Sequence, residues 1–447
     1  MYLNIMSIDK IISLCKRRGF IFQSSEIYGG FGAVYDYGPL GTALKNNISQ
    51  IWWQAMTQFH ENIVGIDSGI LMHPKIWEAS GHVDAFNDPL VDCKQCKARY
   101  PADELFDGNP EDGKWDNIQC PKCGTTGNLT EPRQFNLMFK THIGPVQKDA
   151  NVAYLRPETA QGIYVNYLLT QNAMRLKIPF GIAQIGKAFR NEIIARNFIF
   201  RTREFEQMEM QYFVRPGDDD QSMRDWKDER MAFYSQLGID SGKLRLQEHG
   251  PDELAHYAKE AWDIEFEFPF GWSEIEGIHN RTDFDLARHQ EFSGKKMEVF
   301  DQEANEHYLP YIIETSAGLN RMLLAVLSEA YWEDNENNRI VMKFHPQIAP
   351  VTAAVCPLVK KDGLPEMGRK VMDIVKPHFK VIYDQQGSIG KRYYRQDEAG
   401  TPYGITIDHQ SLEDKTVTLR HRDSQQQDRV AIDQLVSAIN DSMEHYT

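Results

Sequence analysis

Four of the six cysteines stand in two Cys-x-x-Cys pairs, Cys93/Cys96 and Cys120/Cys123. Thiolates at this spacing suit a tetrahedral Zn²⁺ ion, and four protein ligands leave no open position for catalysis. We therefore predict a structural zinc site. The alternative is a metal-free ribbon with four unligated thiols. The other two cysteines stand alone and are expected to be small buried side chains, so nothing indicates a disulfide scaffold.

The stretch around these cysteines, residues 84–148, limits how the rest of the chain can fold. It is rich in Gly, Asp and Asn and has few apolar runs, so it has little core of its own. We predict that it is an insertion between elements of one larger domain. On both sides of it, apolar residues recur with helical or strand periodicity. Helices are expected at 9–15, 45–63, 220–237 and 321–331, and strands at 69–72, 182–190, 204–214, 262–270 and 308–315.

The composition changes at residues 343–350, which contain two prolines. Beyond this point strands alternate with helices, which is typical of a small α/β domain with a largely parallel sheet. Strands are expected at 351–355, 381–384, 403–407 and 416–420, and helices at 365–375 and 389–399.

The 447-residue chain carries a net charge of −15, which argues against a dedicated nucleic-acid-binding protein, since such proteins are usually basic. A large acidic enzyme can still present one basic face to RNA. No apolar run reaches the roughly 18 residues that a membrane span needs. Asp9, Lys10 and Lys16 interrupt the apolar positions near the N-terminus, so no signal peptide is expected. These patterns predict a cytoplasmic protein without membrane association.

Two arginine-bearing segments indicate a ligand that contains phosphate. In the first, a strand ends in Arg190 and Glu192, which share one face because side chains alternate along a strand. After a loop, the return strand begins at Arg201 and leads to Phe205. Arginine forks fit phosphate oxygens, and an aromatic ring suits a stacked purine. Taken alone, the pattern also fits a surface hairpin with a solvated ladder of charges.

In the second segment, residues 312–321, a strand of small residues passes directly into a helix. Gly318 lies at the junction and Arg321 in the first helical turn. Small residues let a ligand approach the backbone, and a helix N-terminus favours anions. On its own, this segment is equally an ordinary strand–helix turn with an exposed arginine.

Together the two segments resemble motifs 2 and 3 of the class II aminoacyl-tRNA synthetases. These motifs are an Arg-x-Glu strand, a loop, a return strand with Arg and Phe, and a Gly-x-x-Arg junction. Residues 45–74 resemble motif 1, a long helix followed by a strand that ends in proline, and all three motifs occur in the order of that class. Longer segments extend the resemblance, over nearly the whole chain, to the glycyl-tRNA synthetases of the homodimeric type. These segments are 16–30, 36–41, 77–83, 155–162 and 205–209.

The resemblance implies an α+β fold with an antiparallel catalytic sheet and flanking helices. The catalytic domain would comprise 1–83 and 151–340, with a zinc-ribbon-like insertion at 84–150 and a C-terminal α/β anticodon-binding domain at 341–447. The implied reaction activates glycine with ATP to glycyl-adenylate and pyrophosphate. Glycine then passes to the 3′-terminal adenosine of tRNA(Gly), and AMP is released. The implied partners are ATP, Mg²⁺, glycine, tRNA(Gly) and a second copy of the chain.

For the ATP site, the resemblance places Arg190 on the α-phosphate, Arg321 on the γ-phosphate side and the Phe205 ring under adenine. Glu274 and Glu314 are the expected Mg²⁺ ligands. The implied catalytic residues are Arg190, Arg321 and Glu314, and the implied ATP-binding residues are Arg190, Asn191, Glu192, Phe200, Arg201, Thr202, Arg203, Glu204, Phe205, Glu274, Ile275, Gly318, Leu319, Asn320 and Arg321.

Glycine offers only an ammonium group, a carboxylate and two hydrogens, so acidic groups and steric exclusion must recognise it. The resemblance assigns Glu158 and Glu209 to the ammonium group, with Glu314 in support, and puts Ser316 where a larger substrate would clash. Every competing amino acid is larger, so close packing excludes it and no editing domain is required. Arg281 is a further candidate near the carboxylate or the phosphates. The implied substrate-binding residues are Arg99, Glu158, Phe205, Glu206, Gln207, Met208, Glu209, Glu314, Thr315, Ser316, Ala317 and Gly318.

Basic and aromatic residues gather in the expected anticodon-binding domain at Lys391, Arg392, Tyr393, Tyr394 and Arg395. Such groups suit phosphate contacts and stacking on unpaired bases, although a solvated face of an amphipathic helix has the same composition. Two other functions remain open from the sequence. One is a synthetase-like RNA-binding protein without catalysis, and the other is a related synthetase that charges proline, threonine or histidine.

Overall fold

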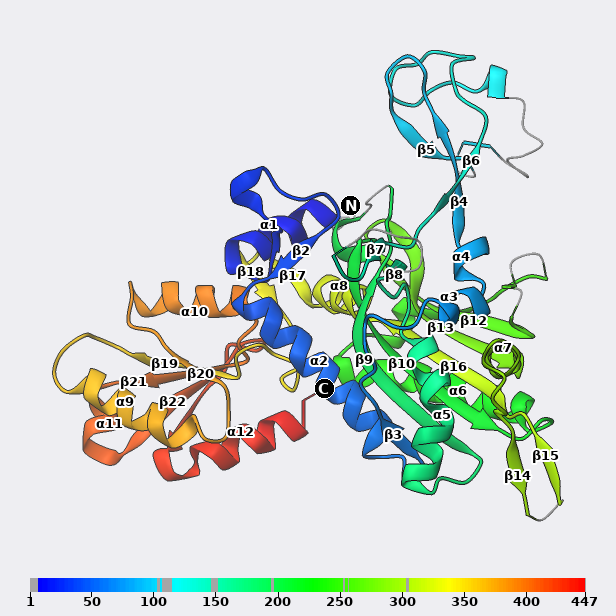
Figure 1. Ribbon diagram of the computed structural model, residues 1–447. Helices are drawn as coiled ribbons and strands as arrows, with labels where there is room; N and C mark the ends of the chain where they lie inside the picture. Colours follow the sequence, from blue (N-terminus) through cyan, green and yellow to red (C-terminus); the bar gives the residue numbers. More distant parts are fainter. Residues whose placement is uncertain are drawn as a thin grey trace.

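The computed structural model describes residues 7–102, 105–106, 115–145, 152–193, 197–251, 254–255, 257–302 and 305–446 of the chain. Figure 1 shows a larger region, a smaller C-terminal region drawn in orange and red, and an arm that projects from the larger region. None of the helices in these ranges is both long and apolar enough to cross a membrane.

A seven-stranded sheet forms the centre of the larger region. All neighbouring pairs are antiparallel except the pair of β3 with β9, where β3 adds a parallel edge strand. This sheet confirms the antiparallel α+β fold that the motifs imply. The strand order is β11 (Leu244–Glu248), β12 (Glu260–Phe268), β13 (Gly271–Thr282), β16 (Tyr311–Gly318), β10 (Glu204–Val214), β9 (Phe180–Phe189) and β3 (Ile63–Gly65).

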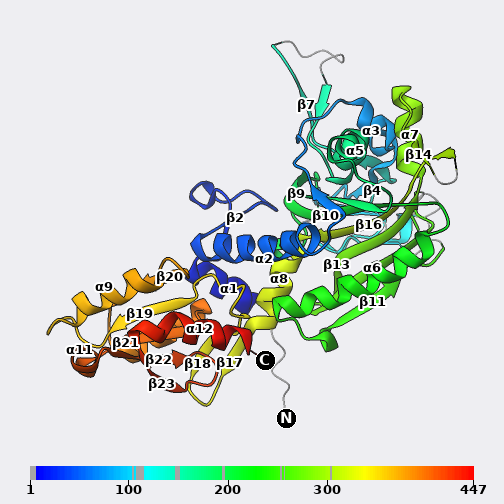
Figure 2. The same ribbon diagram turned by 90° about the horizontal axis from the view of Figure 1, so that it is seen from below.

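Helices cover both faces of this sheet (Figure 2). Because side chains alternate along a strand, β10 gives Met208 and Met210 to one apolar core and Phe213 to the other. One face carries α2 (Pro39–Thr57), α6 (Asp219–Phe233) and α8 (Leu319–Ala330), and the other carries α3 (Lys75–Ala79), α5 (Ala160–Met174) and α7 (Phe284–Ser293).

Short elements connect these layers. The chain begins with α1 (Ile8–Arg18) and the hairpin of β1 (Ile21–Gln23) and β2 (Tyr35–Tyr37), and α4 (His82–Ala85) follows α3. Three further pairs of strands are β7 (Lys140–His142) with β8 (Val152–Tyr154), β14 (Val299–Asp301) with β15 (Glu306–Tyr308), and β17 (Tyr331–Asp334) with β18 (Arg339–Met342).

The arm contains the segment expected to be an insertion. Its three-stranded sheet has the order β5 (Arg99–Pro101), β4 (Asn87–Asp92) and β6 (Arg133–Asn136). A separate small apolar cluster lies around two of the cysteines, Cys93 and Cys120, and includes Val91, Trp115 and Leu129. The arm therefore has a core of its own, distinct from the two cores of the seven-stranded sheet.

The C-terminal region has its own sheet and core. The expected strand–helix alternation is confirmed, but the sheet is mixed rather than largely parallel, because β22 and β23 add as antiparallel strands. The strand order is β20 (Val381–Tyr383), β19 (Ala353–Pro357), β21 (Tyr403–Ile407), β22 (Thr416–His421) and β23 (Gln427–Ala431), and the helices are α9 (Leu364–Val375), α10 (Ile389–Ala399), α11 (His409–Asp414) and α12 (Leu435–Glu444).

The motif 1 segment differs from the expectation of a helix at 45–63. The helix α2 starts at Pro39, because proline is favoured at the first helical position, and it ends at Thr57. Phe59 and Ile63 continue the helical spacing only by coincidence, since Phe59 is exposed and Ile63 begins β3. The strand expected at 69–72 was wrong: this stretch forms only an isolated bridge at Leu71.

The apolar stripe of α2 faces the core of its own chain. Leu44, Ile48, Trp52 and Met56 recur every four residues and are fully buried against the core beneath the sheet. This settles the orientation of the stripe, which from the sequence could equally have faced a second copy.

Candidate active site

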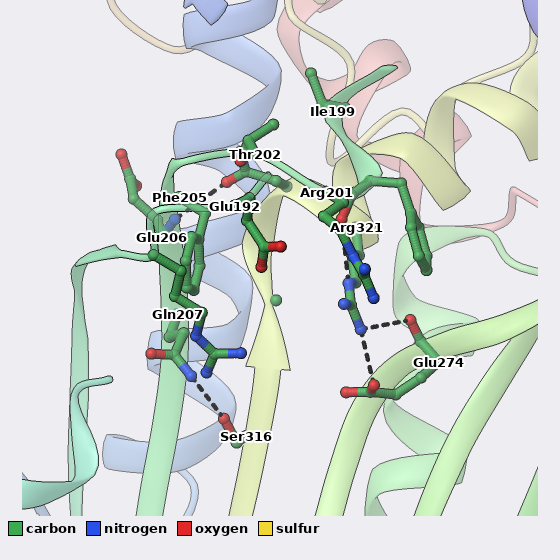
Figure 3. Close-up of a pocket in the computed structure, with 14 residues that line it drawn as sticks. Glu192, Ile199, Arg201, Thr202, Phe205, Glu206, Gln207, Glu274, Ser316 and Arg321 are labelled. Atoms are coloured by element: carbon green, nitrogen blue, oxygen red, sulfur yellow. Dashed lines mark hydrogen bonds and ion pairs between the residues drawn. The ribbon is translucent and has the colours of Figure 1, made fainter. Parts of the chain in front are cut away.

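A cleft opens between β10, β16 and the loop that carries the short 3-10 helix η5 (Phe198–Phe200) (Figure 3). It brings together Arg190, Phe205 and Arg321, which come from three separate parts of the sequence. The cleft is lined by Arg190, Glu192, Ile199, Phe200, Arg201, Thr202, Phe205, Glu206, Gln207, Glu274, Ser316, Gly318, Asn320 and Arg321.

Strand register builds a polar row that continues from this cleft. Gln207, Glu209 and Gln211 share one face of β10 because alternate side chains of a strand point to the same side. Antiparallel pairing places Glu209 opposite Ser316 and Gln211 opposite Glu314. Polar groups from neighbouring strands therefore meet side by side on the sheet.

Arg190 is held at the wall of the cleft by two aromatic rings. Its guanidinium lies 5.3 Å from the ring centroid of Phe205 and 5.3 Å from that of Phe86. Its Nε donates a hydrogen bond to the carbonyl oxygen of Pro157 at 3.1 Å. These contacts fix the orientation of a fork that fits phosphate oxygens.

Arg321 forms a second cationic position, in the first turn of α8 behind the N-cap residue Gly318. Its Nη1 lies 2.8 Å from Oε2 of Glu274, and its guanidinium lies 4.4 Å from the ring centroid of Phe200. The charge of Arg321 lowers the pKa of Glu274 although burial opposes this. The helix N-terminus adds positive potential at the same corner, which therefore suits an anionic ligand.

A β-bulge turns Glu274 toward the cleft. The register between β12 and β13 shifts here, so that Ile275 is an extra residue on β13. Glu276 consequently lies on the opposite face, fully buried, where Arg230 Nε donates to its Oε1 at 2.7 Å. Bulges commonly re-aim side chains in this way beside functional sites.

Three carboxyl groups, those of Glu158, Glu209 and Glu314, cluster where the polar row continues. Gln211 Nε2 donates to Glu209 Oε1 at 3.1 Å and to Glu314 Oε2 at 2.8 Å. The hydroxyl of Thr159 donates to the other oxygen of Glu209. Burial raises the pKa of Glu209, and the charges of Glu314 and Glu158 raise it further. Such a cluster favours a bound cation.

Arg281 keeps Glu314 ionised. Its Nη1 lies 3.2 Å from Glu314 Oε2, its Nε and Nη2 pair with Asp285 at 2.7 and 3.0 Å, and the Tyr257 ring lies 3.7 Å from the guanidinium. Burial disfavours the ionised carboxylate, but Arg281 and His279 outweigh it and hold the pKa of Glu314 below its usual range. Because its donors already meet carboxylates, Arg281 orients the acid cluster.

Glu158 is held at both of its oxygens. Gln161 Nε2 donates to Oε1 at 2.9 Å, and Nε2 of His82 lies 3.4 Å from Oε2. Burial opposes ionisation here as well, yet the charges of His82 and Arg281 lower the pKa of Glu158 to about 2. The carboxylate is thus ionised and fixed in orientation.

Several residues predicted for the site support it from the buried side of the strands and do not line the cleft. The strand residues among them alternate away from the cleft into the core, as expected for every second residue of a strand, and Leu319 begins helix α8. These residues are Met208, Ile275, Thr315, Ala317 and Leu319, each fully buried.

Other predicted residues lie beside the cleft or far from it. The Asn191 amide donates to the Leu137 carbonyl, and Nη1 of Arg203 donates to the Gly32 carbonyl at 2.9 Å. Glu204 forms an ion pair with Lys187. Arg99 lies on β5 in the arm, where its Nε is 2.6 Å from Oδ1 of Asp92. The structure does not bring Arg99 to the cleft.

Sequence reasoning missed Ile199 in the cleft and most of the residues that connect the acid cluster. The roles of Gln161, Gln211, His279 and Asp285 depend on contacts between residues far apart in the chain, which local sequence does not show. One signal was available: a strand that alternates Gln, Glu and Gln with Met carries a polar row that a buried strand normally lacks.

The four paired cysteines meet in the arm, and their Sγ atoms all lie within 4.8 Å of one another. The Sγ atoms of Cys93 and Cys123 are 3.7 Å apart, and those of Cys96 and Cys120 are also 3.7 Å apart. A tetrahedron with Zn–S bonds of about 2.3 Å has edges of about 3.8 Å. The donor set therefore fits a zinc ion in both chemistry and spacing.

The basic and aromatic residues of α10 divide into two groups. Arg392 is buried, and its guanidinium donates to backbone carbonyls that include those of Pro357 and Gly387, so it is structural. Arg395 pairs with an aspartate of its own domain. Lys391 and Tyr394 are the members of this group that are exposed.

Two family models match the chain. One describes an anticodon-binding domain and covers residues 352–442. The other describes the class II tRNA synthetase core domain (G, H, P, S and T) and covers residues 139–330.

The chain is also similar to curated proteins over its whole length. A glycine–tRNA ligase of Treponema denticola is 58% identical over 449 residues, which covers 99% of this chain and 98% of that protein. A glycine–tRNA ligase of Borrelia hermsii is 53% identical and covers 99% of both chains. Among solved structures, a prolyl-tRNA synthetase of Cryptosporidium parvum complexed with halofuginone and AMPPNP has a TM-score of 0.68. That match covers 98% of this chain and 76% of the other at 14% identity, and it supports the fold alone.

Proposed function

Because this chain belongs to the family of glycine–tRNA ligases, we propose that the cleft and the adjoining acid cluster form the site where glycine is activated with ATP. The chain is an enzyme of the class II aminoacyl-tRNA synthetases that attaches glycine to tRNA(Gly). The observation that carries the site assignment is the junction of a cationic, aromatic cleft with three clustered carboxyl groups, two of them buried. A nucleotide fits the first and an ammonium group fits the second.

ATP lies in the cleft with adenine against the Phe205 ring and with Glu192 near its amino group. Arg190 contacts the α-phosphate, and Arg321 lies on the γ-phosphate side. Support comes from the orientation of both guanidinium groups at the cleft wall and from the position of Arg321 at a helix N-terminus.

Glycine binds with its ammonium group among Glu158, Glu209 and Glu314, next to Ser316. Two of these carboxylates are held ionised by neighbouring cations, which prepares the pocket for a positive charge. Glu209 lies opposite Ser316 in the strand pairing, so a side chain on the substrate would collide with the sheet at this point. Overpacking excludes larger amino acids without a second, hydrolytic site.

The chemistry needs positioning and charge neutralisation rather than a protein nucleophile. A carboxylate oxygen of glycine attacks the α-phosphorus, the bond to the β-phosphate oxygen breaks, and pyrophosphate leaves. The 3′-hydroxyl of the terminal adenosine then attacks the carbonyl carbon of the adenylate, and AMP leaves. Arg190 stabilises the charge that develops on the α-phosphate, while the acid cluster keeps the glycyl group in place through both steps.

Mg²⁺ would supply neutralisation of phosphate charge in the cleft. The carboxylate of Glu274 lines the cleft and offers the hard oxygen donor that this ion prefers. Glu314 fits this role less well, because its oxygens already accept from Arg281, Gln211 and His279. We therefore assign Mg²⁺ binding to Glu274 and retain Glu314 for the ammonium group.

The remaining assignments concern the other parts of the chain. Zinc binds the four cysteines of the arm, and residues 341–447 bind the anticodon of tRNA(Gly). The chain forms a homodimer through the motif 1 region, where β3 is an open edge strand and Phe59 is 71% exposed. The domains divide at residues 83/84, 150/151 and 340/341.

Pyrophosphate exchange with a panel of amino acids tests the proposed activity. Exchange with glycine alone supports it, whereas exchange with proline, threonine or histidine would assign a different substrate. Absence of exchange with every amino acid would leave a synthetase-like RNA-binding protein. Arg321→Ala should lower glycine-dependent exchange by about 10²-fold or more. The matched control is Arg245→Ala, which removes an arginine paired with Glu265 outside the cleft.

A further inference from the structure

A second hollow lies behind the acid cluster, between α3, α5 and α7, which lie together in both Figure 1 and Figure 2. Its volume of about 300 Å³ is at the lower end of the range of small-molecule sites. We call it the α3–α7 groove, and none of its residues lines the cleft. It is lined by His73, Lys75, Ile76, Ala79, Val165, His289, Phe292, Ser293, Lys295 and Met297.

The groove combines an apolar floor with basic side chains. Ile76, Val165 and Met297 contribute aliphatic surface, while Lys75 and Lys295 are both exposed. Within the described parts of the chain, neither of these two lysines pairs with a carboxylate. An apolar pocket with a small number of charged groups at its edge selects a ligand that has an apolar body and one charged end. The charge of these lysines requires that end to be an anion.

The α7 wall of the groove is connected to Glu158. His289 lines the groove and is only 6% exposed, and its Nε2 lies 2.8 Å from Oε1 of Gln161. Gln161 in turn donates from Nε2 to Glu158 Oε1. The side-chain oxygen and nitrogen of Gln161 belong to one rigid amide group. A shift of His289, which contacts the oxygen, therefore turns the nitrogen that donates to Glu158.

The α3 wall is connected to the other oxygen of the same carboxylate. Ala79 lines the groove, and Ser80 follows it directly; the Ser80 hydroxyl lies 2.8 Å from Nδ1 of His82. Nε2 of His82 faces Glu158 Oε2. The two walls are themselves joined, because Arg288 Nε of α7 donates to the Ala79 carbonyl at 3.0 Å. Both oxygens of Glu158 are therefore positioned from the two sides of one groove.

We propose that the α3–α7 groove binds a small organic anion with an apolar body, and that its occupancy weakens glycine binding by moving His289 and His82 away from their positions around Glu158. The binding half of this proposal is independent of the proposed function. The coupling half rests on Glu158 being an ammonium ligand. A ligand that separates α3 from α7 binds more tightly when the two helices are apart than when they are together. Such a difference in affinity is the condition for coupling between two sites.

Binding of phenylbutyrate to the full-length protein is measured by isothermal titration calorimetry and by saturation-transfer NMR. Phenylbutanol has the same apolar body without the charge, and butyrate has the charge without the ring. The wild type should bind phenylbutyrate saturably and more tightly than either analogue. Absence of saturable binding, as expected if a second copy of the chain covers the groove, overturns the proposal.

Two variants locate the site. Val165→Trp fills the groove and should abolish phenylbutyrate binding, whereas persistent binding overturns the assignment. Lys75→Glu combined with Lys295→Glu should remove the preference for phenylbutyrate over phenylbutanol. The matched control is Lys177→Glu combined with Lys370→Glu, which makes the same change of charge at exposed lysines elsewhere and should keep the preference.

Coupling is measured as the KM for glycine and the KM for ATP in pyrophosphate exchange, with and without phenylbutyrate. Saturating phenylbutyrate should raise the KM for glycine about fivefold or more and leave the KM for ATP unchanged. The Lys75→Glu/Lys295→Glu variant should keep the basal KM for glycine and lose this response. Binding without any effect on glycine overturns the coupling. Failure of the proposed activity would instead appear as absent exchange with binding intact.

Discussion

Glu209 shows how a single buried carboxyl group connects function to stability. Its pKa is raised by burial first and then by Glu314 and Glu158, so the folded protein keeps a proton on this carboxyl to a higher pH than the unfolded chain does. The stability that this proton contributes is fully present below the ordinary Glu pKa of about 4.3 and is lost as the pH rises through the raised value. As the pH rises above the ordinary Glu pKa, Glu209 therefore comes to favour unfolding, and glycine binding would offset this.

Glycine binding should release a proton from Glu209 at pH values below its raised pKa, because the ammonium group favours ionised Glu209. The KM for glycine should accordingly fall as the pH rises toward the raised pKa of Glu209. Isothermal titration in buffers of different ionisation enthalpy measures the number of protons released on glycine binding. Glu209→Gln should bind glycine with no proton release and with an affinity weaker by roughly 1–3 kcal/mol.

The control for this measurement is Glu267→Gln, at an exposed position of the same sheet. That variant should release the proton like the wild type. Proton release that survives in Glu209→Gln would show that another group of the cluster carries the proton.

The elements follow the sequence wherever local pattern and tertiary environment agree. β10 and α10 have the bounds expected from periodicity, because each has a consistent apolar alternation and clear end signals. β13 was not predicted, although it is a central strand of the catalytic sheet. Its Gly, Ser and Glu residues break the alternation, and its charged Glu276 is compensated by Arg230 and by the Tyr234 hydroxyl, which are far from it in the sequence. Such a partner cannot be read from the local sequence.

The same limit applies to the site. The cleft residues other than Ile199 lie in contiguous motifs and were named from the sequence, whereas the residues that hydrogen-bond with Glu158 and Glu314 are dispersed along the chain. In α10, composition alone could not separate a structural arginine from an exposed lysine, since burial depends on which carbonyls the fold brings within reach.

Substitutions in helix α10 should therefore affect either stability or RNA binding, depending on whether the side chain is buried or exposed. Arg392→Ala leaves several buried carbonyls without their donor and should destabilise the C-terminal region by about 2–4 kcal/mol. Lys391→Ala combined with Tyr394→Ala should leave stability within about 0.5 kcal/mol of the wild type, because both side chains are exposed. Denaturant unfolding measures the first effect.

The double variant at Lys391 and Tyr394 should raise the KM for tRNA in aminoacylation while pyrophosphate exchange stays unchanged. An unaltered KM for tRNA would place the anticodon contacts on another element of the domain.

At the scale of the whole molecule, the arm and the cleft are separate units. They are connected by the residues at the base of the arm around Phe86 and Leu137, which we call the stem. The arm has its own apolar cluster around the cysteines, and the residues that line the cleft all lie later in the chain, between Arg190 and Arg321. The stem does reach the site, since Phe86 lies against Arg190 and the carbonyl of Leu137 accepts from the Asn191 amide.

Removal of zinc should therefore unfold the arm locally and leave the catalytic sheet intact. Treatment with a strong chelator is expected to expose the arm to proteolysis, while glycine-dependent exchange stays within about threefold of the untreated enzyme. Zinc content, limited proteolysis and exchange are measured on the same samples. If the rate of glycine-dependent exchange fell in parallel with the zinc content, unfolding of the arm would be affecting Arg190 through the stem.

The pairing of Asn87 with Asn136 at the base of the arm has a consequence for the history of such a chain. The two ends of the arm leave and re-enter the catalytic domain side by side, so a short turn could join them without moving either strand end. A lineage could thus gain, lose or exchange this module in one genetic event, and the ancestral enzyme need not have depended on metal.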